Sequence, residues 1–400
     1  MIIGVLIVAL TARYLGPEGR GMLAVLTTWA VGFATLFHLS LGQVALHLAA
    51  GREDKGWLDE TLASLVAWCV AATLLAWVSS VLLYEATAGR AFGTLSPGLL
   101  AVGMLIIPLL VWEQYGSSLL MALNRLDVAN LYQVIGRTVT LVVVVMGLLL
   151  IGPWVACVLV ANLLGQAVVA FGGLRHMRRH FVGPRWAISL PGLLRSGLHL
   201  HFNAVGTFLF ASCDILILNH FAGPAETGYY QLGVQLLAVL MVLPQAAGSV
   251  LYAKVAELGP DRAWAVQRRI ILQILGLMLV IVATAAFLAE PIVIVVAGQA
   301  FLPTVEVFRW QLLSVIGMSL AALMAPQWIG RGLFRTASML TLAFGVINVS
   351  LSLWLVQEHG KLGVAWAGAA TFLVAIVSNG AFAWWCGRRA HGAAASIGQA

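Results

Sequence analysis

The sequence GPEGRG at residues 16–21 recurs in altered form as GPAETG at residues 223–228. In both stretches a glycine precedes a proline, and another glycine stands five positions after the first. Each stretch ends one apolar segment and begins the next. A spacing of 207 residues (16 to 223) in a chain of 400 indicates that a unit of about 200 residues occurs twice.

Two further pairs of segments support the duplication. AGRAF at residues 88–92 resembles AGQAF at residues 297–301, with a spacing of 209, and Asn124-Arg125 corresponds more loosely to Phe334-Arg335, with a spacing of 210. Duplicated units are typical of membrane transporters, in which the substrate path lies at the interface of the two halves.

The composition indicates an integral membrane protein. Hydrophobic residues make up 61% of the chain and charged residues 9%, whereas a soluble domain carries about 25% charged residues. The four cysteines all lie in apolar segments, which indicates neither a disulfide framework nor a cysteine-based metal site. The net charge of +7 fits Lys and Arg retained on the cytoplasmic side of a membrane and does not indicate binding to nucleic acid.

The sequence contains twelve apolar segments, and we compare the length of each with the roughly 20 residues that a helix needs to cross a membrane. We therefore predict an all-α integral membrane fold with about twelve transmembrane helices in two pseudo-symmetric six-helix bundles. The first segment is too short, and we expect the natural protein to start upstream of Met1. The segments lie at about residues 1–12, 22–48, 58–84, 97–123, 129–151, 153–173, 196–221, 229–253, 268–289, 304–329, 336–357 and 362–386.

The distribution of Lys and Arg predicts the orientation and the domains. With both termini in the cytoplasm, most of the 22 Lys and Arg residues fall in inner loops, as the positive-inside rule requires. Only Arg13, Arg20, Arg90 and Lys361 fall in outer loops, and Arg137 and Arg309 fall within spans. We predict an N-terminal bundle at residues 1–174, a basic cytoplasmic linker at 175–195, a C-terminal bundle at 196–387 and a cytoplasmic tail at 388–400.

Polar side chains within spans are costly in hydrocarbon and therefore indicate partners or a water-filled cavity. Asn130, Gln133 and Arg137 lie three and four residues apart, on one face of a predicted helix. Glu113, on the preceding span, lies at nearly the depth of Arg137. The two side chains could form a structural salt bridge, or line a cavity in which Arg137 meets an anionic headgroup.

A second set of polar residues lies in the seventh and eighth predicted spans. Asp214 is either a carboxylate that pairs with a neighbouring helix or a proton or sodium site of a coupled carrier. Asn203 and Gln235 serve either as hydrogen-bonding partners between helices or as ligands of sugar hydroxyl groups.

The sequence argues against an enzyme. It contains no G-x-x-x-x-G-K-[ST] phosphate loop, no G-x-S-x-G motif and no H-E-x-x-H motif. We also predict no large loop of the kind that a membrane glycan polymerase or ligase needs. We expect no catalytic residue, no metal site and no cofactor.

Several motifs resemble those of polysaccharide transporters. ARYLGPEGRG at residues 12–21 is similar to the segment that joins the first two helices of that family. Asp214 with the glycines of 223–228 resembles its seventh-to-eighth helix region, and Gly330-Arg331, Asn348 and residues 360–366 resemble its last two helices. This family of O-antigen repeat-unit flippases belongs to the multidrug/oligosaccharidyl-lipid/polysaccharide exporter superfamily.

The resemblance implies two six-helix bundles around a cavity, and the flipping of a polyprenyl-pyrophosphate-linked oligosaccharide repeat unit across the bacterial cytoplasmic membrane. A pyrophosphate substrate needs a cation in that cavity. We predict the substrate-binding residues Arg137, Asn130, Gln133, Glu113, Asn203 and Gln235, and Asp214 as an ion-coupling residue.

The resemblance also implies partners: membrane lipids, a polysaccharide polymerase and glycosyltransferases, but no nucleic acid, for a protein that acts as a monomer. The alternatives are a cation-coupled exporter of drugs or metabolites with the same fold, a lipid II flippase and a membrane glycan polymerase. Asp214 and Glu113 fit the exporter of cationic compounds, whereas Arg137 argues against it.

Overall fold

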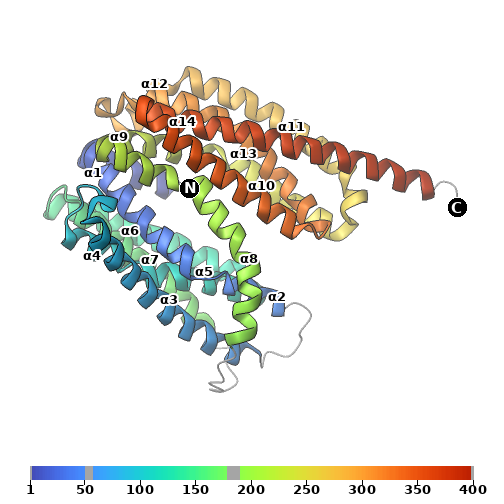
Figure 1. The fold of residues 1–400 in the computed structure, drawn as a ribbon, viewed down its shortest axis with the longest axis horizontal. Coiled ribbons are helices and arrows are strands. Elements are labelled where there is room, and N and C mark those ends of the chain that lie inside the picture. The colour runs from blue at the N-terminus through green and yellow to red at the C-terminus, as the bar shows by residue number, and fades with distance from the viewer. Residues whose placement is uncertain (1, 50–56, 178–189, 398–400) are drawn as a thin grey trace. The chain divides into compact units, whose positions relative to one another are not determined.

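A computed structural model describes residues 2–49, 57–177 and 190–397, and within these ranges every regular element is a helix. Figure 1 shows long helices joined by short turns. The helices are α1 (Ile2–Phe37), α2 (Leu41–Ala49), α3 (Trp57–Thr87), η1 (Arg90–Phe92), α4 (Pro97–Met104), α5 (Ile107–Ala122), α6 (Leu126–Leu150), α7 (Val155–Met177), α8 (Leu190–Ala211), α9 (Cys213–Leu240), α10 (Val242–Leu258), α11 (Pro260–Phe287), α12 (Ala289–Ala297), η3 (Gln299–Phe301), α13 (Thr304–Gly330) and α14 (Phe334–Ile397).

Nine stretches of the described residues are long and apolar enough to cross a membrane. Three of them, in α1, α9 and α14, contain a glycine at which the backbone leaves the helical conformation: Gly16, Gly223 and Gly360. These kinks coincide with the boundaries predicted between successive apolar segments. Because the described spans are helical and many large apolar side chains on them are exposed, the chain is an all-α, multi-pass membrane protein.

The duplicated motif has the same backbone conformation in both copies. Gly16 has φ 66° and ψ −176°, and Gly223 has φ 82° and ψ −179°. Only glycine adopts this region readily, because a Cβ atom would clash with the backbone. The conserved spacing of 207 residues therefore repeats a conformation as well as a sequence.

The second pair of segments repeats too. Gly89 and Gly298 both have positive φ, and each precedes a short 3-10 helix that ends in a fully buried phenylalanine, Phe92 or Phe301. The third predicted pair is shifted. The left-handed residue Asn124 has its counterpart in Gly332, not in Phe334, and this spacing of 208 lies between the spacings of 207 and 209 of the other two pairs.

The two copies of the glycine–proline motif contact each other in a reciprocal way. A Cβ atom on Gly21 would lie 1.7 Å from the carbonyl oxygen of Pro224, and a Cβ atom on Gly228 would lie 2.0 Å from that of Pro17. Only glycine lets the backbones of α1 and α9 approach so closely. The second glycine of each motif is thus a packing requirement.

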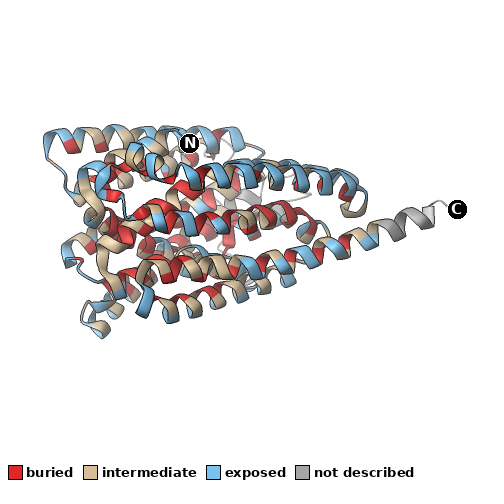
Figure 2. Cartoon of the chain, turned by 90° about the horizontal axis from the view of Figure 1, so that it is seen from above, coloured by how far each residue is buried: buried red, intermediate tan, exposed pale blue. Residues whose placement is uncertain are grey.

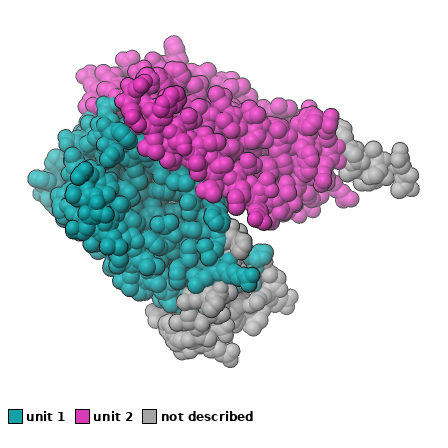
Figure 3. All heavy atoms as spheres, viewed as in Figure 1, with its two compact units in different colours: residues 1–228 teal, residues 229–400 magenta. Residues whose placement is uncertain are grey.

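The chain divides into two compact units, residues 1–228 and 229–400 (Figure 3). The division falls inside α9. Residues 178–189 of the basic linker predicted at 175–195 lie outside the described residues. Within the units, helices carry buried residues on one side and exposed residues on another (Figure 2). Many exposed positions are large and apolar, among them Leu150 and Val377, as lipid contact requires.

In unit 1 the predicted span at residues 22–48 is broken in two. α1 ends at Phe37, and Leu39 and Ser40 have positive φ values of 48° and 52° before α2 begins. The Ser40 N–H donates to Nδ1 of His38 over 2.8 Å, and the hydroxyl group of Tyr115 donates to the His38 carbonyl oxygen over 2.7 Å. These bonds replace part of the helical hydrogen bonding that the break removes.

Unit 2 contains a polar network that joins α11 to the end of α13. Arg331 is almost fully buried, and it donates to Asp261 over 2.7 Å and to Gln327 over 3.0 Å. Gln327 donates in turn to the side-chain oxygen of Gln267 over 2.7 Å. Beside this network, Trp328 stacks on Phe382 with ring centroids 3.6 Å apart. The hydrogen-bonded chain fixes one end of the unit.

Candidate functional site

Glu113 on α5 is the centre of a polar cluster in unit 1. One of its carboxylate oxygens accepts a hydrogen bond from the Nε2 amide of Gln133 on α6, and the other accepts from the Nε2 amide of Gln166 on α7. Three helices therefore converge on one partly buried carboxylate. A cluster of this kind, inside a membrane-spanning region, can hold a charge away from water.

Close packing of α6 against α7 positions the two amides. A Cβ atom on Gly165 would lie 2.6 Å from the carbonyl oxygen of Gly136 and 2.0 Å from the hydroxyl oxygen of Thr140. Gly165 precedes Gln166, and Gly136 stands one turn after Gln133. The small residues bring the backbones together, as is usual between membrane helices, and so direct both amides toward α5.

A small hollow of about 20 Å³, which has room for one water molecule, borders this cluster in unit 1. Its lining includes Glu113, Ser117 and Tyr132, together with apolar and small residues of α5, α6 and α7. The hollow gives the Glu113 carboxylate a small neighbouring space whose lining is mostly apolar.

Arg137 lies outside this cluster. Its side chain is exposed, and its Nη1 lies 3.9 Å from the position that a Cβ atom on Gly4 of α1 would take. The pair with Glu113 that the sequence suggested is not among the ion pairs of the described residues, because Glu113 is occupied by two amides. Asn130 is also exposed, two turns before Arg137 on α6.

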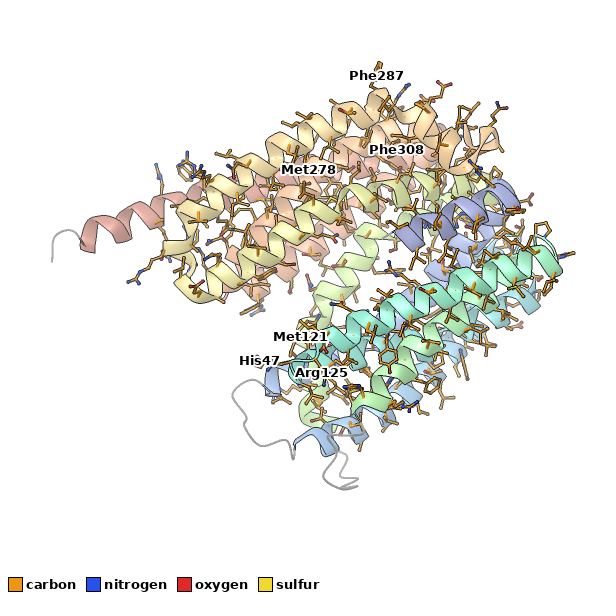
Figure 4. All side chains as sticks on the ribbon, turned by 180° about the vertical axis from the view of Figure 1, so that it is seen from behind. His47, Met121, Arg125, Met278, Phe287 and Phe308 are labelled. Atoms are coloured by element: carbon orange, nitrogen blue, oxygen red, sulfur yellow. The ribbon has the colours of Figure 1, made fainter. Side chains whose placement is uncertain are left out.

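The turn between α5 and α6 lies at one end of unit 1. Figure 4 shows Met121, near the end of α5, and Arg125, just before α6, at the same end of unit 1 as His47 of α2. Arg125 forms an exposed pair with Asp127 over 3.0 Å. Arg137 stands eleven residues into α6, which places it about 17 Å from the start of that helix.

The remaining predicted residues belong to the helices α8 and α9. Asn203 is exposed on α8, where its carbonyl oxygen accepts from Thr207 over 2.8 Å. Gln235 belongs to unit 2 and is partly buried on α9. Asp214 is buried in the first turn of α9, where the positive end of the helix dipole stabilises a carboxylate.

Two polar residues of unit 1 have environments that the sequence analysis missed. Gln166 is the third member of the Glu113 cluster, and the available signal was an amide one helical turn after Asn162 in an otherwise apolar helix. Arg20, predicted in an outer loop, is buried within α1 and donates from Nη1 to the hydroxyl oxygen of Thr11 over 2.8 Å. The kink at Gly16 brings the two together.

Among the residues that the structure describes, no three His, Cys, Asp or Glu side chains are grouped so that they could hold a metal ion. The Glu113 cluster has one carboxylate and two amides. This composition differs from that of a transition-metal centre, which uses imidazole or thiolate ligands.

Comparison with known proteins identifies the family. The family model described as "Polysaccharide biosynthesis protein" matches residues 1–253. The chain belongs to this family. Comparison with curated protein sequences gives no match.

The fold is similar to that of a solved lipid flippase and of solved multidrug transporters. A structure titled "Lipid II flippase MurJ, inward closed conformation" has a TM-score of 0.77 at 14% identity, covering 94% of this chain and 84% of its own. An inward-facing multidrug resistance MATE transporter of the MOP superfamily has a TM-score of 0.71 at 15% identity, covering 96% of each chain. A MATE structure in the straight conformation has a TM-score of 0.60 at 18% identity, covering 98% of this chain and 94% of its own. The family member is therefore a membrane protein with a transporter fold.

Proposed function

We propose that this protein flips a polyprenyl-pyrophosphate-linked oligosaccharide repeat unit from the cytoplasmic to the outer leaflet of the bacterial cytoplasmic membrane by alternating access. Membership of the polysaccharide biosynthesis family supports a glycan substrate. The likeness to a flippase of lipid II supports a fold able to move a lipid-linked molecule. On this proposal both termini are cytoplasmic, and the protein acts as a monomer beside glycosyltransferases and a polymerase.

The proposed choice of substrate depends on the position of Arg137. It is an exposed arginine in a membrane-spanning helix, and it forms no ion pair with any described residue. An arginine side chain stays charged, and burying that charge in lipid is costly. A pyrophosphate offers oxygen acceptors that match the fork of the guanidinium group, so an anionic headgroup satisfies Arg137.

Other exposed polar residues of unit 1 extend the proposed substrate site. Asn130 is exposed on the same helix as Arg137, and Asn203 is exposed on α8 of the same unit. Their amides can donate to and accept from sugar hydroxyl groups. Gln133 and Glu113 contribute less directly, because each is already hydrogen-bonded to the other.

The test is complementation of a strain that lacks the gene. Arg137→Ala is expected to reduce surface glycan at least tenfold at normal protein abundance in the membrane, because the loss of a charge-assisted contact costs about 1.5–3 kcal/mol. Arg137→Lys keeps the charge and is expected to restore part of the glycan. Wild-type glycan from Arg137→Ala would remove this residue from the mechanism.

Arg309→Ala is the matched control. Arg309 is another exposed arginine in a membrane-spanning helix, α13, but its Nε donates to the carbonyl oxygen of Ala286 over 3.2 Å. It therefore has a structural partner, and its replacement is expected to leave glycan levels near those of the wild type. An equal loss from both alanine variants would indicate a general effect of arginine removal and contradict the assignment.

A cation-coupled multidrug or metabolite exporter is the second candidate. The likeness to MATE transporters and the carboxylate of Glu113 favour it. This candidate predicts that deletion of the gene sensitises cells to cationic drugs and leaves surface glycan intact. The flippase proposal predicts the opposite pair of results.

A further inference from the structure

A groove lies between α3 and α4 of unit 1, two helices that can be followed in Figure 1. Its volume is about 430 Å³, which is within the range of pockets that hold small organic molecules. The lining comes from residues 77–85 of α3 and residues 97–105 at and after the start of α4, and it is mostly apolar. A groove of this kind in a membrane-spanning region suits a lipid chain.

Pro108 accounts for the groove. A proline has no backbone N–H, and its ring clashes with the carbonyl group four residues earlier, which is that of Met104. The helix is interrupted there, between α4 and α5, and the indole nitrogen of Trp77 on α3 donates to the Met104 carbonyl oxygen over 3.0 Å. Since α4 packs mainly against α1 and α7, whereas α3 packs against α1, α5 and η1, a space is left between α3 and α4.

The groove has about the length of one membrane leaflet. Glu85 lies two residues before the end of the span Thr61–Thr87, and Trp77 lies ten residues before it. At the rise of a helix, the groove extends about 12 Å along α3 and reaches about 15 Å into the membrane. The hydrocarbon core is about 30 Å thick, so each leaflet accounts for half of it. An acyl chain in the groove would therefore have its headgroup beside Glu85.

The charge at the mouth of the groove indicates the kind of headgroup. Of the described residues that line the groove, only Glu85 is charged; it is exposed and forms no ion pair with any described residue. A pyrophosphate or an anionic headgroup would place like charges side by side, which is unfavourable. An ammonium group would instead donate charge-assisted hydrogen bonds to the carboxylate.

A cation for the lipid phosphate lies in the turn that follows α3. Arg90 stands five residues after Glu85, at the start of η1, and its side chain is exposed. It forms no ion pair with any described residue. The guanidinium group matches the geometry of phosphate oxygens. One carboxylate and one arginine at headgroup level therefore complement a zwitterionic phospholipid.

The second half of the chain lacks the residues that form the groove. There the single helix α13 runs from Thr304 to Gly330, where unit 1 has the interrupted pair α4 and α5. The repeated architecture thus does not require the interruption, and its presence in unit 1 points to a bound molecule. At a spacing of 208, the counterparts of Trp77, Glu85 and Pro108 are Ala285, Val293 and Ile316.

We infer that the groove between α3 and α4 binds the acyl chain of a phospholipid with a primary ammonium headgroup, phosphatidylethanolamine, whose ammonium group pairs with Glu85. On the orientation proposed above, this lipid lies in the outer leaflet. None of the residues that line the groove belongs to the proposed substrate site. The inference therefore stands or falls separately from the proposed flipping of oligosaccharide.

The experiment is native mass spectrometry of the purified full-length protein, released from detergent that contains equal amounts of phosphatidylethanolamine, phosphatidylcholine and phosphatidylglycerol with identical acyl chains. We expect about one phosphatidylethanolamine molecule per chain, in preference to the other two lipids. The choline headgroup has no N–H donor for the carboxylate, and the glycerol headgroup has no cation.

Two variants separate the headgroup from the chain. Glu85→Gln keeps the shape of the side chain, removes the charge, and is expected to weaken phosphatidylethanolamine binding about fivefold while leaving phosphatidylcholine binding unchanged. Ala101→Phe places a ring in the groove at an exposed position and is expected to reduce the binding of all three lipids. If Ala101→Phe does not fold, Glu85→Gln tests the inference by itself.

Glu290→Gln and Ala343→Phe are the matched controls. Each changes an exposed residue of the same kind in unit 2, the first on α12 and the second on α14. Both variants are expected to bind phosphatidylethanolamine as the wild type does, because neither residue lines the groove.

Three results would overturn the inference. One is equal phosphatidylethanolamine binding by Glu85→Gln and the wild type. Another is equal binding of the three lipids by the wild type, which would make the groove a place of unspecific lipid contact. The third is tighter binding of a polyprenyl phosphate than of phosphatidylethanolamine, which would assign the groove to a polyprenyl chain. None of these measurements requires a glycan, so the proposed flippase activity keeps its own test.

Discussion

Replacing Gly16 by alanine isolates the backbone strain of the duplicated motif. Gly16 has φ 66° and ψ −176°, and a Cβ atom there would meet no atom within 4 Å. Steric crowding with neighbouring groups therefore makes no contribution. The cost is conformational, since residues with a Cβ atom rarely occupy this region, and it amounts to about 1–3 kcal/mol. At about tenfold for each 1.4 kcal/mol, the ratio of folded to unfolded protein falls by a factor of about 5 to 150.

The assay is the thermal stability of the detergent-purified protein, read as the temperature at which half of the monodisperse fraction is lost. Gly98→Ala is the control, because a Cβ atom at Gly98 also meets nothing within 4 Å but the residue lies in the helix α4 without a positive φ. Alanine favours a helix over glycine by up to about 1 kcal/mol. The control should therefore equal or exceed the stability of the wild type, while Gly16→Ala falls below it.

Two further variants sharpen this prediction. Gly223→Ala should be destabilised about as much as Gly16→Ala, since the two residues share one conformation. Gly16→Asn should not recover stability, because asparagine tolerates the left-handed helical region but not a ψ near 180°. If Gly16→Ala proved as stable as Gly98→Ala, the assignment of a strained backbone at this turn would be refuted.

Two other variants test packing and charge. Gly21→Ala should lower stability more than Gly16→Ala, because its Cβ atom would lie 1.7 Å from a backbone oxygen of Pro224 that cannot rotate away. The measurement is the folded yield of Gly21→Ala compared with that of Gly276→Ala, whose Cβ atom meets nothing within 4 Å. Equal yields of the two variants would contradict the close contact. Asp261→Asn should lower the free energy of unfolding by about 1–2 kcal/mol, because it weakens a charge-assisted hydrogen bond to the buried side chain of Arg331. The effect is limited because Asp261 is partly exposed to solvent. Unchanged stability of Asp261→Asn would show that the remaining bonds of Arg331 suffice.

Much of the helix arrangement could be predicted from the sequence because glycine and proline mark places where a helix must bend. Gly16, Gly223 and Gly360 separate apolar segments at the predicted positions. The break after Phe37 could not be predicted, because Leu39 and Ser40 are not residues that usually adopt positive φ. Tertiary contacts stabilise that break, and a local pattern does not contain them.

The candidate site was predicted only in part. Helical spacing placed Glu113 and Arg137 at similar depth, but depth does not determine the rotation of a helix about its axis. The tight approach of α6 and α7 directs Gln133 toward Glu113 and leaves Arg137 beside α1. Gln166 could not be placed in the site from the sequence, because its spacing of four from Asn162 on α7 does not show that its side chain faces Glu113 on α5.

The reciprocal contact of the two glycine–proline motifs is self-complementary. Each copy offers a proline carbonyl and receives one against a glycine, as the two subunits of an isologous dimer do. A half-length ancestor could have paired with itself through this turn before its gene was duplicated and fused. In such a dimer, one mutation would have changed both sides of the contact at once. After the fusion, each side could change separately, provided that it still fitted the other.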